Sequence, residues 1–66
     1  MTIAEAIKQA VNETDRSRRA VLLRDVMNDM RFRLRLNYQK SQEMFAKCGI
    51  DAGQFEELCM EVDNDN

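Results

Sequence analysis

The stretch SRRAVLLRDVMNDMRFRLRLNY, residues 17–38, decides the fold, because its apolar residues repeat at two different periods. At the helical period a second, weaker stripe carries Val21, Phe32 and Leu36 beside a main one. The main stripe, with Ala20 at its edge, consists of Leu23, Val26, Met27, Met30, Leu34 and Tyr38. A helix with two apolar stripes needs cover on both sides, from neighbouring helices and from a symmetry mate. This period therefore predicts a central helix through which a homodimer forms.

The rival period is 2, and it covers residues 30–38. There the apolar residues alternate with Arg31, Arg33, Arg35 and Asn37, which is the pattern of a half-buried strand. Such a strand would have to pair with its copy in another subunit, since the chain shows no second strand. The first 48 residues contain neither proline nor glycine, which favours helices over a fold that needs many turns. We therefore predict an all-α bundle of three or four helices, with the strand as the alternative.

Helix boundary signals lie on both sides of this stretch. Thr2 and Glu5 form a capping box that predicts an N-terminal helix. Asp51 and Gln54 form a second capping box, which predicts the last helix over residues 52–62. Gly49 suits the left-handed position that ends the helix before it.

The third helix has two candidate starts, at Asn37 and at Ser41. The helices together predict one domain over residues 1–62. Residues 63–66 have the sequence DNDN, and we expect a disordered polar tail there.

The small size of the chain limits its core and its cellular setting. A domain of 66 residues buries only about 60% of its unfolded surface, so oligomerisation is the expected support. Two cysteines and no histidine leave no zinc site. Because nothing resembles a signal peptide and no apolar run approaches about 20 residues, we expect a cytoplasmic protein with reduced thiols and no membrane contact.

The residue types present argue against an enzyme. Without histidine, a serine or cysteine nucleophile lacks its usual base. The chain has no glycine-rich phosphate loop and too few residues to build an enclosed pocket. We expect no catalytic, metal-binding or cofactor-binding residues, and no small-molecule substrate.

Charge is distributed unevenly along the chain, with a basic middle and an acidic end. Residues 16–35 hold seven arginines against Asp25 and Asp29, whereas residues 48–66 hold six acids and no base. Either surface is a candidate contact for a partner. The candidate protein-binding residues are Asp51, Glu56, Glu57 and Glu61. The candidate nucleic-acid-binding residues are Arg31, Arg33, Arg35, Arg18 and Arg19.

Two stretches resemble DNA-binding families. Residues 41–62 are similar to the helix-turn-helix of bacterial regulators in the apolar and glycine positions Met44, Cys48, Gly49, Ile50, Phe55 and Leu58. This stretch departs from that family at Phe45, where a small residue is usual, and in a recognition helix that carries acids and no base. Residues 30–62 resemble a ribbon-helix-helix dimer, with a strand at 30–38 and helices at 41–48 and 52–62. That resemblance implies base contacts by Arg31, Arg33 and Arg35.

The features together predict a small non-enzymatic interaction protein that binds a protein partner through helical surfaces. Regulators, adaptors and inhibitors from phages and plasmids often have this size, acidity and helical character. The alternative is a DNA-binding transcriptional regulator that uses the arginines of residues 31–35.

Overall fold

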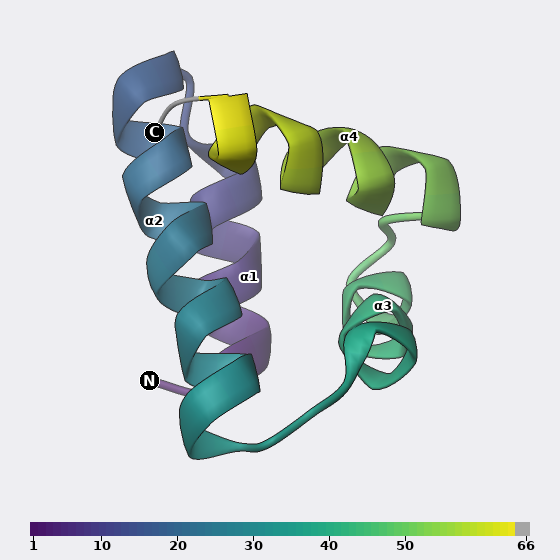
Figure 1. Ribbon diagram of the computed structural model, residues 1–66. Coiled ribbons are helices and arrows are strands. Elements are labelled where there is room, and N and C mark those ends of the chain that lie inside the picture. The colour runs from purple at the N-terminus through teal and green to yellow at the C-terminus, as the bar shows by residue number, and fades with distance from the viewer. Residues whose placement is uncertain (65–66) are drawn as a thin grey trace.

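Four α-helices and one π-helical turn form the fold in the computed structural model, which describes residues 1–64 (Figure 1). The elements in chain order are α1 (Ile3–Asn12), α2 (Arg16–Asn28), the π-helical turn η1 (Asp29–Arg33), α3 (Tyr38–Lys47) and α4 (Ala52–Asn64). The predicted all-α fold is confirmed.

The helices are arranged as a hairpin closed by a second pair. α1 and α2 lie side by side and run in opposite directions, and η1 continues α2 (Figure 1). The chain then crosses to α3, and α4 returns toward the beginning of α2 (Figure 1). The last helix therefore packs against the second one, although residues 29–51 separate them in the chain.

The two predicted capping boxes are present. The Thr2 hydroxyl accepts a hydrogen bond from the Glu5 backbone N–H at 3.2 Å, and the Glu5 carboxylate accepts from the Thr2 N–H at 3.1 Å. These hydrogen bonds lower the pKa of Glu5. Asp51 and Gln54 make the same reciprocal pair at 2.8 and 3.0 Å. Both boxes satisfy backbone donors that a helix start otherwise leaves unpaired.

The remaining helix boundaries follow from local hydrogen bonds and backbone angles. α3 begins after Asn37, whose side chain accepts from the Lys40 N–H at 2.8 Å. Gly49 has a φ of 87°, the left-handed conformation that glycine adopts without penalty. α4 continues to Asn64, two residues past the predicted domain limit, and residues 65–66 of the predicted tail lie outside the described part of the chain.

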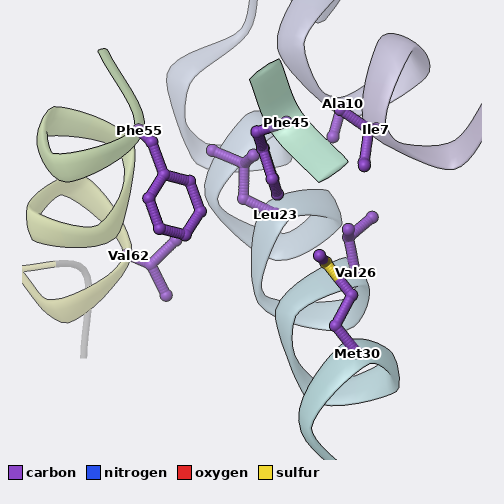
Figure 2. Close-up of a cluster of buried hydrophobic side chains, with 8 residues drawn as sticks. All are labelled: Ile7, Ala10, Leu23, Val26, Met30, Phe45, Phe55 and Val62. Carbon is purple, nitrogen blue, oxygen red and sulfur yellow. The ribbon is translucent and has the colours of Figure 1, made fainter. Parts of the chain in front are cut away.

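All four helices contribute to one hydrophobic core (Figure 2). Its centre is Phe45, which is fully buried and whose ring centroid lies 4.8 Å from that of Phe55. The other buried side chains are Ile7, Ala10, Ala20, Leu23, Val26, Met30 and Val62. The predicted main stripe is confirmed from Ala20 to Met30, with Met27 partly buried beside it.

The predicted continuation of this stripe beyond Met30 is wrong. Leu34 and Tyr38 are 36% and 58% exposed, because the central helix ends at Arg33. In η1 the Leu34 N–H bonds to the Asp29 carbonyl five residues back, and this wider turn rotates the following side chains off the stripe. Arg35 then takes a left-handed conformation, with a φ of 56°. It occupies the position where glycine usually ends a helix.

The alternative strand at residues 30–38 is also wrong. Met30 to Arg33 are helical, and no strand occurs within residues 1–64. The second stripe has a mixed outcome: Leu36 packs against the core, whereas Val21 and Phe32 remain exposed. The single chain therefore buries only part of this second stripe.

Candidate functional site

Residues 31–38, here called the basic–aromatic segment, form the most exposed concentration of arginines and aromatic rings. Phe32 is 67% exposed and Tyr38 is 58% exposed. Arg31, Arg33 and Arg35 are exposed in the same segment. The segment is held in place by η1 on one side and by the start of α3 on the other.

The three arginines of this segment have different surroundings. Arg33 forms a bidentate ion pair with Asp29, at 2.6 and 2.7 Å, which lowers the pKa of that carboxyl. The Arg31 guanidinium lies 5.4 Å from the Phe32 ring centroid, within range of a cation–π contact. Arg33 is therefore neutralised within the chain, and Arg31 and Arg35 supply most of the positive potential.

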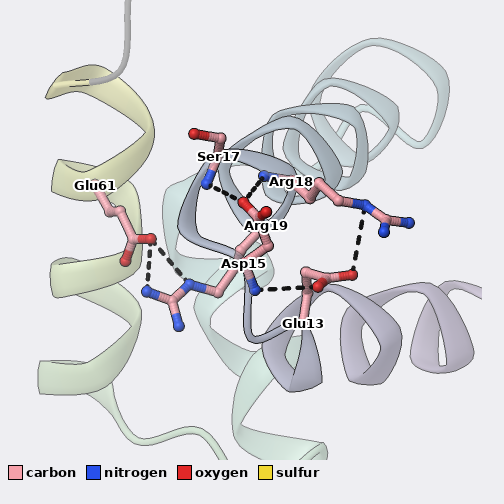
Figure 3. A network of polar contacts seen from close by, with 6 residues as sticks. All are labelled: Glu13, Asp15, Ser17, Arg18, Arg19 and Glu61. Carbon is pink, nitrogen blue, oxygen red and sulfur yellow. Dashed lines mark hydrogen bonds and ion pairs between the residues drawn. The ribbon is translucent and has the colours of Figure 1, made fainter.

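Arg18 and Arg19 lie at the opposite end of the central helix. About twelve residues separate them from Arg31, which places them about 18 Å away along the helix axis. Arg19 donates to Glu61 of α4 at 2.9 and 2.8 Å, and this pair is partly buried (Figure 3). Arg18 lies 3.9 Å from Glu13 (Figure 3). The five candidate nucleic-acid-binding arginines thus form two groups rather than one surface.

The four candidate protein-binding acids are divided in a similar way. Glu61 is turned inward by its bond to Arg19, and Asp51 caps α4. Glu56 and Glu57 are exposed on the outer side of α4. These two, with Met60 beside them at 56% exposure, form an exposed surface whose carboxylates are not used in a cap or in the Arg19 bond.

The stretch with the helix-turn-helix resemblance consists of α3, the turn at Gly49 and α4. Phe45 takes the position where the family has a small residue, and its ring fills the core between the two helices. The would-be recognition helix exposes Glu56 and Glu57, whose charge repels phosphates. α4 therefore offers no base for the phosphate contacts that the helix-turn-helix resemblance implies.

A cleft lies between the end of the central helix, the start of α3 and α4. It consists of two adjoining hollows of about 510 and 350 Å³. Both are lined by Met27, Arg31, Tyr38 and Cys59, and the larger one also reaches Asp63. One wall therefore carries Arg31 and Tyr38, whereas the α4 wall is mostly apolar and carries the acid Asp63.

The thiol and the phenol of the cleft both have a raised pKa. Burial raises the pKa of the Cys59 thiol, and the nearby Asp63 and Glu56 raise it further. Desolvation also raises the pKa of Tyr38, with a contribution from Glu56. Neither group is activated as a nucleophile, because activation requires a lowered pKa.

Residues 1–64 contain no cluster of three or more side chains arranged to hold a metal ion. Within the same residues, no helix is both long enough and apolar enough to cross a membrane. No protein-family model, curated protein or solved structure matches the chain.

Sequence reasoning found the arginines of the site but missed the cleft. The second apolar stripe carries a signal for it, because Leu36 of that stripe lines the smaller hollow. The opposite wall comes from Cys59 and Asp63, more than twenty residues along the chain, and no local pattern brings them together with Arg31.

Proposed function

We propose that the protein is a non-enzymatic binding module that captures a protein partner through the basic–aromatic segment. The observation that carries this proposal is the exposure of Phe32 and Tyr38 beside Arg31 and Arg35. Aromatic rings and arginines contribute most of the binding energy in protein interfaces. An exposed phenylalanine in a chain with a small core also costs solvation energy, which a partner would recover.

Charge around the cleft favours a protein over a nucleic acid as the partner. Glu56 and Asp63 lie on the α4 side of Tyr38, and Asp29 already neutralises Arg33. A phosphate backbone laid across the segment would meet these acids. A protein segment can instead place carboxylates against Arg31 and an apolar side chain against Phe32.

Capture experiments with matched variants test this proposal. Immobilised wild type, Phe32→Ala and Val21→Ala would be incubated with lysate of the cells that encode the protein. Val21→Ala is the control, because Val21 is also an exposed apolar residue of the central helix but lies outside the segment. We expect a protein that wild type and Val21→Ala retain and Phe32→Ala loses.

The captured protein would then be purified and titrated against each variant. We expect Phe32→Ala to weaken binding about tenfold or more, as is usual for an aromatic hot spot. Equal affinity for all three proteins would contradict the proposed contact.

Nucleic-acid binding by the same arginines is the alternative function. Exposed aromatic rings beside arginines favour it, because bases stack on such rings. Fluorescence anisotropy with labelled single- and double-stranded DNA at low salt tests it, with Arg31→Ala/Arg33→Ala/Arg35→Ala for comparison. Binding that this triple variant abolishes and that salt weakens steeply would favour the alternative.

A further inference from the structure

The outer face of α4 has the chemistry that complements the basic–aromatic segment. Glu56, Glu57 and Met60 are exposed there, and their spacing of three and four residues places them on one side of the helix. Met60 is thus an exposed apolar side chain next to two carboxylates. The basic–aromatic segment has the same arrangement with the opposite charge, because the apolar Phe32 lies next to the basic Arg31.

The two surfaces are neighbours on the molecule. The cleft lies between the segment and α4, since Arg31 and Tyr38 line one wall and the α4 residues Cys59 and Asp63 line the other. Glu56 is close enough to Tyr38 to influence its ionisation. Adjacent surfaces of opposite charge can pair twice in a two-fold dimer, because each copy presents both halves of the contact.

We propose that two copies of the chain associate about a two-fold axis, with the acidic outer face of α4 of each copy on the basic–aromatic segment of the other. This inference rests on the proposed function in one respect, namely that the same segment is the contact. It differs from the dimer expected from the sequence, which placed the central helix at the interface. A protein partner would then compete with the second copy for the segment.

Association of this kind removes three of the large exposed apolar side chains from water. Phe32, Tyr38 and Met60 are each more than half exposed in the single chain. Burying them in a symmetric contact covers all three in both copies at once. A chain of 66 residues gains from this, because its own core is small.

Charge inversion gives a sharp test. Variant A is Arg31→Glu/Arg35→Glu, which makes both surfaces acidic. Variant B is Glu56→Arg/Glu57→Arg, which makes both surfaces basic. Each variant repels its own copy, yet A and B together restore both contacts of the two-fold pair. Lys8→Glu/Arg18→Glu is the control, with the same charge change as A at sites outside the segment and the cleft.

The readout is sedimentation equilibrium of each purified protein and of the equimolar mixture. We expect wild type and control to form a species of twice the 7.7 kDa chain mass. We expect A and B alone to dissociate with a constant raised about 100-fold, and the mixture to recover the dimer. Circular dichroism establishes that each variant remains helical.

Three results overturn the inference. Wild type that remains monomeric at millimolar concentration shows that the surfaces do not pair. Dimers of A and B that match wild type place the interface elsewhere. Variants that dissociate but do not recover on mixing show that the two surfaces are not each other's partners. A monomeric wild type whose captured partner still requires Phe32 would refute the dimer and leave the proposed function intact.

Discussion

Replacing Arg35 with glycine is expected to stabilise the protein. Arg35 has a φ of 56°, which brings its Cβ close to the following carbonyl oxygen. This conformation costs a residue with a side chain about 1–2 kcal/mol. Glycine avoids that cost but loses about 0.5–1 kcal/mol through the greater freedom of its unfolded chain. The net gain is therefore about 0.5–1 kcal/mol, which corresponds to a rise of about 4 °C in Tm for a domain of this size.

Urea denaturation followed by circular dichroism measures this difference. Arg35→Ala is the matched control, because it removes the same charge and keeps the Cβ that causes the strain. We expect Arg35→Ala to be close to wild type and Arg35→Gly to be more stable. If both variants are stabilised equally, the gain comes from removing a charge. If Arg35→Gly is less stable than wild type, the left-handed residue is not a source of strain.

Three further predictions concern the turn, the core and the surface. Gly49→Ala is expected to lower the free energy of unfolding by about 1 kcal/mol, because Gly49 has a φ of 87°. A steric clash does not contribute, since no heavy atom lies within 4 Å of an added Cβ. Unchanged stability in urea would contradict this prediction. Phe45→Ala is expected to cost about 3–5 kcal/mol, because the ring is fully buried at the centre of the core, and a melting temperature near that of wild type would exclude this role. The ion pair with Arg33 lowers the pKa of the Asp29 carboxyl from its ordinary value of 3.8. The pair therefore adds its full stability to the fold above the ordinary pKa, and this stability is lost as the pH falls through the lowered pKa of the folded state. Asp29→Asn should therefore lose less stability than wild type on acidification, measured as the urea midpoint at each pH, and parallel curves would refute the assignment.

Helix starts could be predicted from the sequence because their causes are local. The Thr2 and Asp51 side chains bond to backbone groups three residues away, so the residues that define each cap stand together in the chain. The buried stripe from Leu23 to Met30 was likewise readable, since helical spacing alone puts these side chains on one face.

The end of the central helix could not be predicted in the same way. An arginine in the left-handed conformation is uncommon, and no neighbouring proline or glycine marks the break. The alternation of residues 30–38 is real, but it spans a π-helical turn, a bend and a helix start rather than a strand. The alternation shows only which residues are apolar. It does not determine the backbone conformation, which η1 and Arg35 set in this segment.

The sequence also could not predict which charged side chains pair with each other and which remain exposed. The excess of arginine in the middle and of acid at the end was visible, and both groups were candidate contacts. Which charges neutralise each other depends on the packing of α4 against α2. That packing joins Arg19 to Glu61 and leaves Glu56 and Glu57 exposed.

The bond between Arg19 and Glu61 has a consequence for folding kinetics. It joins residues 42 positions apart, whereas the α1–α2 hairpin is built from neighbours in sequence. Contacts that close a long loop form after local ones, so this bond is expected to be absent from the transition state for folding. Its loss in Glu61→Ala should then accelerate unfolding and leave the refolding rate unchanged. The bond would therefore determine the lifetime of the folded state and not the rate at which the chain folds.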